Sequence, residues 1–314
     1  MRVYDCFTFY NEFELLELRL KVLYDLVDYF VIVEANRTFT NKPKDFNLPN
    51  RKDDFKEFAA KIRYIPADLS KVPFKGTGDW SIEYAQRNAI AYGLTDAAPD
   101  DLIMISDLDE IPAPDIFQRL QENRLALRGF CVLPLLTRKE QVAIPAQLLI
   151  PATNYLEVGA IALAQRGIYY YFDRASVSDN WPGTILVKRK NLTTPQHMRN
   201  LRNVLIRASG GGYHFSYMGG VDRVMNKMTS IVDGNELVVK SGGKALDRKH
   251  VEEVISKGGI DLYLQNESKE APFPFSDARN IKLPYLDEFL RKYPYFLHEP
   301  EKYFGENVNG ATDL

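Results

Sequence analysis

The first third of the chain alternates short apolar runs with amphipathic segments, and this alternation constrains the fold more than any other feature. The apolar runs predict strands at residues 2–9, 29–33, 62–65 and 102–105. The segments between them predict helices at residues 12–27, 53–60 and 80–94. Strands and helices that alternate in this way build parallel sheets, so we predict an α/β fold with a mainly parallel central sheet flanked by helices.

The pattern becomes less regular after residue 129. Further strands are predicted at residues 130–136, 168–172 and 185–187, whereas residues 137–165 between them are ambiguous. Further helices are predicted at residues 221–231, 245–255 and 285–292. We therefore predict a main domain over residues 1–232 and a helical extension over residues 233–314, packed on the same domain.

Composition and charge exclude several classes of protein. With 314 residues, 45% of them hydrophobic, the chain can bury a sizeable core. The formal net charge of -2 gives no global field for binding nucleic acid or an anionic membrane. Because the start of the chain lacks the features of a signal peptide and no apolar run approaches a membrane span, we expect a cytoplasmic protein. Two distant cysteines, Cys6 and Cys131, fit a reducing compartment.

The stretch DLIMISDLDEIPAP, residues 101–114, ends an apolar strand in a cluster of negative charge. Asp107 and Asp109 are two residues apart just after that strand, so both carboxylates can face one site where parallel sheets bind their ligands. With Glu110 they form a cluster of like charges that a cation would neutralise, and Mg²⁺ or Mn²⁺ holding a diphosphate suits such oxygen ligands. The alternative is an acidic turn that caps a helix near Pro114. The apolar strand in front of the cluster favours the metal site.

Two further positions are candidates for the same site. His214 lies in the glycine-rich segment GGYHFSYMGG, and we predict a third metal ligand there, with a hydrogen-bonded structural histidine as the alternative. Glu83 and Arg87 are four residues apart on a predicted helix. They form either an exposed ion pair or a pair whose arginine points at a diphosphate or orients an aspartate of the cluster.

Aromatic residues are concentrated in the less regular half of the chain. The run at residues 169–172 and Trp181 could pack on the flat faces of sugar rings, although strand packing is the commoner reason for such residues. Residues 181–184 read as a loop, which makes them the stronger candidate for contact with a substrate.

Together these stretches resemble glycosyltransferase family 17, whose animal members add the bisecting N-acetylglucosamine in β1,4 linkage to the core mannose of N-glycans. The resemblance covers most of residues 1–232 in order, and little of it extends into the last eighty or so residues. The matching stretches are YDCFTFYNEFELLELRL, FVIVEANRTFTNKPK, WSIEYAQRNAI, ISDLDEIP, YYYF, the Trp-x-Gly-Thr element and GGYHFSYMGG with Lys227 downstream.

The resemblance implies a GT-A type nucleotide-sugar transferase fold and inverting transfer of GlcNAc from UDP-GlcNAc to an oligosaccharide acceptor, with a divalent metal. It makes Asp107 and Asp109 a D-x-D motif and places Phe9, Asn11 and Glu34 near the nucleotide. Two departures leave the acceptor open. Animal relatives are Golgi membrane proteins, whereas this sequence shows no anchor, and SIVDGNEL stands where a histidine is expected before the glutamate.

The predicted mechanism is a direct displacement at the anomeric carbon. Asp107, Asp109 and His214 would hold Mn²⁺ or Mg²⁺ on the UDP diphosphate, with further positive charge from Lys227 and Arg87. A carboxylate must also take the proton of the acceptor hydroxyl. The candidates for this base are Asp222, which stands nearest His214 in sequence, Asp179 and Glu236.

Two other functions remain open from the sequence. A sugar-1-phosphate nucleotidylyltransferase would also use a parallel sheet with acidic metal ligands, but it usually carries a glycine-rich basic loop after its first strand, where this chain reads FTFYNEFE. A non-catalytic carbohydrate-binding protein would need the aromatic residues without the metal cluster.

Overall fold

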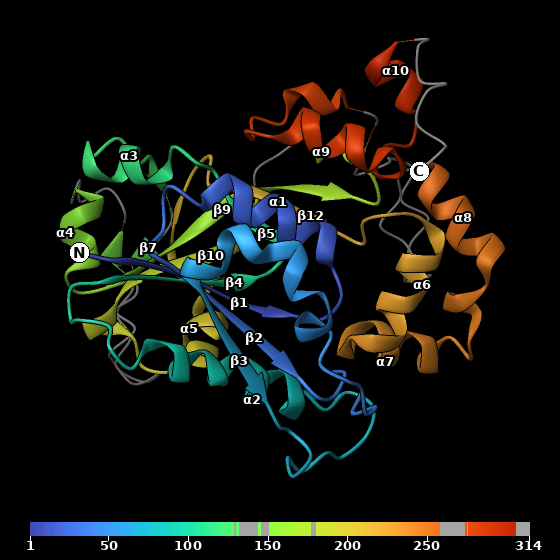
Figure 1. Ribbon diagram of the computed structural model, residues 1–314, viewed down its shortest axis with the longest axis horizontal. Coiled ribbons are helices and arrows are strands. Elements are labelled where there is room, and N and C mark those ends of the chain that lie inside the picture. The colour runs from blue at the N-terminus through green and yellow to red at the C-terminus, as the bar shows by residue number, and fades with distance from the viewer. Residues whose placement is uncertain are drawn as a thin grey trace.

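The computed structural model describes residues 1–128, 130–131, 144–145, 151–176, 180–257, 274 and 276–305 (Figure 1). Within these residues, ten strands form one sheet whose order is β3, β2, β1, β4, β10, β9, β11 and β6, and β12 pairs with both β9 and β5. The strands of this sheet are β1 (Val3–Phe9), β2 (Tyr29–Ala35), β3 (Ile62–Ala67), β4 (Leu102–Asp107), β5 (Glu110–Pro112), β6 (Leu127–Arg128), β9 (Ala160–Tyr169), β10 (Trp181–Lys188), β11 (Ile206–Ala208) and β12 (Gly212–Ser216). A separate pair joins β7 (Phe130–Cys131) and β8 (Ile144–Pro145).

Helices cover both faces of the sheet, and others lie beyond its two ends. The α-helices are α1 (Phe13–Leu23), α2 (Ser81–Asn88), α3 (Ile116–Gln121), α4 (Ala152–Leu156), α5 (Pro195–Leu201), α6 (Val221–Ser230), α7 (Val232–Lys240), α8 (Arg248–Lys257), α9 (Leu286–Lys292) and α10 (Pro300–Phe304). Two longer 3-10 segments are η1 (Leu48–Lys61) and η2 (Ala89–Leu94). No helix among the described residues is both long enough and apolar enough to cross a membrane.

The first four strands confirm the prediction from sequence. Strands β3, β2, β1 and β4 are parallel neighbours, and every residue of β1 is buried. Such burial on both faces explains why these strands read as continuous apolar runs. The register pairs Thr8 with Asp107 and Phe9 with Glu34, so the carboxyl ends of these strands meet at one edge of the sheet.

The second half of the sheet is mixed, so the prediction of a mainly parallel sheet is wrong there. Strand β10 runs antiparallel to both β4 and β9. The connection from β9 to β10 is short and contains no crossover helix within the described residues, and antiparallel neighbours are the arrangement that a short connection allows. Residues 181–184 belong to β10, with an irregular register between Pro182 and Ile185, so the prediction of a loop at these residues is also wrong.

Other predicted elements differ in detail. The helix predicted at residues 53–60 is part of η1, which is kinked because Arg51 and Phe55 leave the helical region. The helix predicted at residues 80–94 is divided between α2 and η2. The strand predicted at residues 168–172 ends with β9, because Tyr170 has a φ of 67°. Most of the strand predicted at residues 130–136 lies outside the described residues.

The sheet separates two hydrophobic cores. On one face, Phe7, Phe30 and Met104 pack with Leu16 and Leu20 of α1. On the other face, alternate residues of the same strands pack against α2, η2 and α5. The members of this second core are Cys6, Val31, Ile103, Ile105, Ile82, Ile90 and Met198. Helices on both faces confirm that the central sheet is flanked by helices.

The helices of the last third pack in two places. Figure 1 shows α6, α7 and α8 beyond one end of the sheet, opposite α3 and α4. A third core joins α6, α7 and α8 to Tyr170 and Tyr217. Phe289 and Phe296 instead join the core on the α1 face, where they contact Phe172. The division of the chain at residue 232 stays a prediction.

Strand β12 is joined to the turn between β4 and β5 by backbone pairing. His214 pairs with Glu110, Tyr213 with Ile111 and Gly212 with Pro112. A side chain at Gly212 would place its Cβ 2.2 Å from the carbonyl oxygen of Ile111, and the φ of this glycine is +118°. Only glycine therefore fits this close backbone approach.

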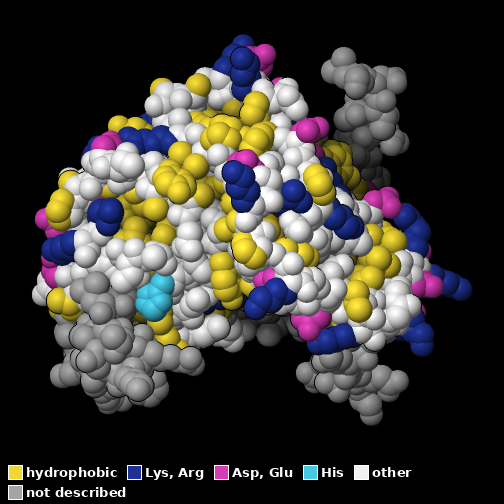
Figure 2. Space-filling model, turned by 90° about the horizontal axis from the view of Figure 1, so that it is seen from below, with side chains coloured by type: hydrophobic (Ala, Val, Ile, Leu, Met, Phe, Trp, Pro, Cys, Tyr) yellow, Lys and Arg dark blue, Asp and Glu magenta, His cyan; other side chains and the backbone are white. Residues whose placement is uncertain are grey.

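The outer surface carries both signs of charge. Figure 2 shows Lys and Arg side chains scattered among hydrophobic and acidic ones on the face seen from below. The described residues on this face form no continuous basic surface.

Candidate active site

A cavity of about 930 Å³ opens where β1 and β4 end. Strand ends and the turn between β4 and β5 contribute Phe9, Asp107 and Asp109 to its lining. Helices α2, α5, α6 and the first turn of α7 line the rest together with β12. The acidic stretch predicted to lie at a ligand crevice therefore lies in one.

Two arginines hold the carboxylate of Asp107. Arg87 donates a hydrogen bond to Oδ1 at 2.8 Å, and Arg199 donates one to Oδ2 at 2.7 Å. Burial disfavours the ionised form of Asp107, but Arg199 and Arg87 together keep the pKa of this carboxyl well below its usual range. Both oxygens of this predicted metal ligand are thus taken by guanidinium groups.

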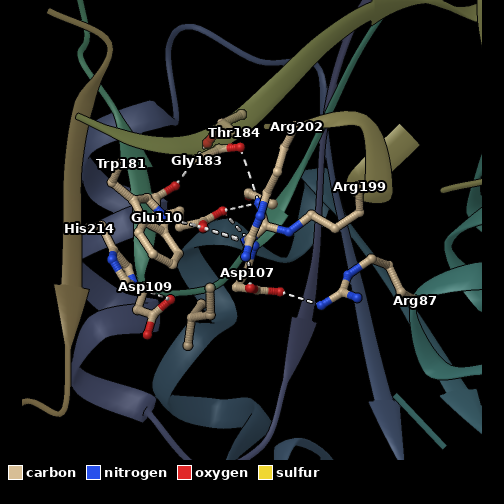
Figure 3. A network of polar contacts seen from close by, with 12 residues as sticks. Arg87, Asp107, Asp109, Glu110, Trp181, Gly183, Thr184, Arg199, Arg202 and His214 are labelled. Carbon is tan, nitrogen blue, oxygen red and sulfur yellow. Dashed lines mark hydrogen bonds and ion pairs between the residues drawn. The ribbon is translucent and has the colours of Figure 1, made fainter. Parts of the chain in front are cut away.

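Glu110 is more deeply buried than Asp107, and its hydrogen bonds hold the neighbouring side chains in place. Its carboxylate is fully buried and accepts hydrogen bonds from both terminal nitrogens of Arg199, at 2.8 and 2.5 Å. It also accepts from the backbone N–H of Asp107 at 3.1 Å and from Nε1 of Trp181 at 2.7 Å. Figure 3 shows Arg199 and Arg87 reaching this centre from one side, with Trp181 and His214 on the other.

Asp109 faces two different partners. The ammonium of Lys227 lies 2.8 Å from its Oδ2, and Nε2 of His214 lies 3.8 Å from its Oδ1. Burial opposes the charge of Lys227, but Asp109 raises the pKa of this ammonium. Burial lowers the pKa of His214 even though Asp109 opposes the shift, so its imidazole is neutral at neutral pH. Oδ1 of Asp109 and the neutral imidazole of His214 therefore lie side by side.

The indole of Trp181 is held in place on the cavity wall. His214 stacks on it with ring centroids 4.4 Å apart, and the guanidinium of Arg202 lies 4.8 Å from its centroid. With the hydrogen bond to Glu110, these contacts give Trp181 a fixed orientation. The residue lines the cavity as the sequence suggested, but from a strand instead of a loop.

The interpretation of Glu83 and Arg87 as an exposed pair is wrong. The side chain of Arg87 is 2% exposed, and besides Glu83 it binds Asp107 and, at 2.6 Å, Gln196. The alternative reading, in which Arg87 orients an aspartate of the acidic cluster, describes the structure.

The residues predicted to bind the nucleotide divide into two groups. Phe9, Asn11, Arg87 and Lys227 line the cavity with Asp107. Glu34 is not among the lining residues.

Glu34 is instead a buried anchor of the loop that follows β2. Its carboxylate accepts hydrogen bonds from Lys44 at 2.8 Å, from the backbone N–H of Asn47 and Leu48, and from the hydroxyl of Tyr64. Lys44 lines the cavity, so Glu34 supports the cavity wall indirectly by holding this loop.

The predicted bases do not come together in the cavity. The side chain of Asp222 is 82% exposed and paired with Arg248, because it points outward from the first turn of α6. Glu236 pairs with Lys240 on α7 and does not line the cavity. Asp179 lies outside the described residues.

Four cavity arginines were missed from the sequence, namely Arg37, Arg199, Arg202 and Arg223. Arg199 and Arg202 lie three residues apart at the end of α5 and both line the cavity. A signal was present, since Thr194 caps this helix and Pro195 occupies its first position, which is a common helix start. Such a start would have placed both arginines on one helix face.

Asp109 and His214 supply some, but not all, of the ligands that a divalent cation needs. A neutral imidazole and a carboxylate oxygen 3.8 Å apart can both reach one ion, and Nδ1 of His214 is buried without a hydrogen-bond partner. No group of three or more His, Cys, Asp or Glu residues suited to a metal occurs among the described residues. Asp109 and His214 therefore suit a cation that takes its remaining ligands from a diphosphate or water, and Asp107 does not.

The region that holds the acidic turn is also the region in which this chain matches a known protein family. Residues 1–125 match the profile of glycosyltransferase family 17. The chain is similar to the β-1,4-mannosyl-glycoprotein 4-β-N-acetylglucosaminyltransferases of Rattus norvegicus and Mus musculus, each 24% identical over 327 residues, which cover 99% of this chain and 57% of the relative. The Homo sapiens protein of that name is 30% identical over 129 residues, or 39% of this chain and 24% of that protein. The chain thus spans little more than half the length of the rat and mouse relatives.

Proposed function

Because residues 1–125 match glycosyltransferase family 17, we propose that the chain is an inverting glycosyltransferase that moves GlcNAc from UDP-GlcNAc to a hydroxyl of a glycan. The family match confirms the resemblance found in the sequence, and the names of the relatives support a GlcNAc transferase. The nucleotide, the metal and the stereochemistry are part of the proposal.

One observation gives this proposed function its main support. The turn that holds Asp107 and Asp109 lies at the carboxyl end of β4, on the wall of a cavity large enough for a nucleotide sugar, and it belongs to the matched region. The parallel order of β3, β2, β1 and β4 in front of this turn supports a GT-A type fold.

Asp109 and His214 are the residues that would hold a divalent cation. When bound, Mn²⁺ or Mg²⁺ neutralises the charge of the diphosphate. Lys227 and Arg202 line the same cavity and can donate to the phosphate oxygens of the leaving group. Arg87 and Arg199 instead hold Asp107, so their charge is already balanced by carboxylates.

The ordered side chains also position the reactants. Glu110, through Arg199 and Trp181, fixes both the acidic turn and the wall next to His214. Phe9 and Asn11 line the cavity where β1 ends, which supports their proposed contact with a nucleotide bound at the strand ends. A site of this kind contributes by positioning and by electrostatic stabilisation of the departing UDP.

The test is a transfer assay with the full chain. A panel of UDP-sugars with Mn²⁺ is incubated with and without oligosaccharide acceptors, and UDP release is measured. We expect the fastest release with UDP-GlcNAc plus acceptor, and a large trans-diaxial anomeric coupling in the NMR spectrum of a β-linked product. An α-linked product, or release of pyrophosphate in place of UDP, would overturn the proposal.

A further inference from the structure

An inverting transfer needs a base that the residues described so far do not supply. Such a base must face the cavity and must have a carboxylate oxygen free to accept a proton. Asp222 and Glu236 are in the described part of the chain, but neither lines the cavity. The remaining candidates are the carboxylates on the cavity wall itself.

Most of those carboxylates are already engaged. Asp107 and Glu83 both accept hydrogen bonds from Arg87. Asp109 accepts one from Lys227. A carboxylate that is held by a cation is a weak proton acceptor, because the cation stabilises its ionised form.

Glu12 is engaged by the backbone. Its Oε2 accepts hydrogen bonds from the N–H groups of Asn11, at 3.0 Å, and Tyr10, at 3.3 Å, just before α1 begins. This geometry ties the carboxylate to the loop that follows β1.

Asp233 differs from all of these. It lies in the first turn of α7 and lines the cavity next to Val232 and Ile231. Within the described part of the chain, its carboxylate forms no hydrogen bond and no ion pair, although it is solvent accessible. Its interaction within the chain is with the N-terminus of α7, which leaves both carboxylate oxygens accessible from the cavity.

The surroundings of Asp233 also suit a base. Partial burial raises the pKa of Asp233, the neighbouring Glu236 raises it further, and Arg202, which also lines the cavity, opposes both effects. A raised pKa strengthens a carboxylate as a proton acceptor. Glu236 is itself paired with Lys240, so it stays on the helix surface beside Asp233.

We propose that Asp233 is the catalytic base of the transfer, an inference that rests on the proposed function. The acceptor hydroxyl gives its proton to the carboxylate of Asp233 as its oxygen bonds to the anomeric carbon of GlcNAc. The bond from that carbon to the β-phosphate oxygen breaks, and its electron pair leaves with UDP.

The position of Asp233 agrees with this displacement. Asp109 and His214 approach the cavity from the β4–β5 turn and β12, whereas Asp233 approaches from α7. An in-line displacement requires the attacking hydroxyl and the leaving diphosphate to lie on opposite sides of the anomeric carbon. The acceptor therefore binds along the part of the cavity wall formed by the start of α7.

The experiment compares Asp233→Asn with two matched variants of the full chain. Asparagine keeps the shape of the side chain but cannot accept the proton. Glu236→Gln removes a carboxylate from the next turn of α7, and Asp222→Asn removes an exposed one from α6. Each is assayed with UDP-GlcNAc, Mn²⁺ and an oligosaccharide acceptor, and UDP binding with Mn²⁺ is measured by calorimetry.

We expect Asp233→Asn to lower kcat by about 10²–10⁴-fold with unchanged UDP binding, whereas Asp222→Asn keeps wild-type kcat and Glu236→Gln, which removes a charge that raises the pKa of Asp233, shifts the acid limb of the pH profile to lower pH. The pH profile of wild-type kcat/KM should fall at acid pH, and Asp233→Asn should lose this limb. Wild-type kcat in Asp233→Asn would overturn the assignment and leave the transferase function standing. Parallel loss of UDP binding would make Asp233 a donor-binding residue and also overturn it. No UDP release by wild-type protein from any UDP-sugar would overturn both.

Discussion

Arg19 and Asp5 form an ion pair in which neither side chain is exposed to solvent, with Nη2 of Arg19 2.6 Å from Oδ1 of Asp5. The same guanidinium donates through Nη1 to the carbonyl oxygens of Asp107, Leu108 and Glu110. Helix α1 and strand β1 therefore hold the acidic turn by its backbone. This arrangement leaves the side chains of the turn available for the cavity.

Arg19→Met should lower the free energy of unfolding by about 3–5 kcal/mol, because it leaves the carboxylate of Asp5 buried without its partner. Urea unfolding of the variant and the wild type measures the change. Arg291→Met is the control, since its pair with Asp287 is exposed and should contribute less than about 1 kcal/mol. Equal losses in both variants would contradict the assigned role of the buried pair.

Arg199→Lys should destabilise the chain by about 2–3 kcal/mol even though the charge is kept. A single ammonium cannot bridge Asp107 and Glu110 as the guanidinium does, so one of the two carboxylates loses the hydrogen bonds that residue 199 donates to it. Thermal or urea unfolding reports the loss, and UDP binding reports displacement of the acidic turn. A lysine variant as stable as the wild type would show that the bridge is not needed.

His214→Ala should weaken binding of Mn²⁺ in the presence of UDP by at least about 10-fold, and excess Mn²⁺ should partly restore transfer. EDTA should abolish transfer by the wild type, and Asp109→Asn should abolish it at any metal concentration. His197→Ala is the control because His197 lies on α5 outside the cavity lining. Full activity in EDTA would remove the metal from the proposed mechanism.

Stability should depend on pH through Asp96, which binds Arg63 and Arg2. Arg63 in particular holds the pKa of Asp96 well below its usual range. A carboxylate with a lowered folded-state pKa stabilises the fold above its unfolded value of about 3.9, and this contribution is lost as the pH falls through the folded value.

Asp96→Asn should therefore lower the free energy of unfolding at pH 6 by less than about 1 kcal/mol, because the pair is partly exposed. The difference from the wild type should shrink when unfolding is measured near pH 3 at low ionic strength. A difference that is constant between the two pH values would assign the effect to packing instead of charge.

The parts of the fold that were predictable are those in which the local pattern agrees with the final packing. Residues 2–9 and 102–105 read as buried strands because both of their faces are covered in the structure. The direction of β10 was not predictable, because it depends on which strands it pairs with and not on its own residues. Helix propensity at residues 53–60 was overridden by the kinks of η1.

The same distinction applies to the site. Asp109, His214 and Lys227 were found because each belongs to a local motif, and all three line the cavity. Arg199 reaches Asp107 across 92 residues of sequence, a contact that no local pattern encodes. Asp233 is distinguished by lining the cavity without a hydrogen bond or an ion pair among the described residues, and this can be seen only in the folded chain.

The backbone pairing of β12 with β5 has a consequence for how such a protein can diversify. Main-chain hydrogen bonds set the spacing between Asp109 and His214, so substitutions elsewhere can hardly retune it. Another part of the cavity wall is built from the start of α7, which belongs to a different segment of the chain. If the proposed transfer takes place here, selection or a protein engineer can exchange the acceptor by remodelling that wall, while the Asp109–His214 arrangement is kept unchanged.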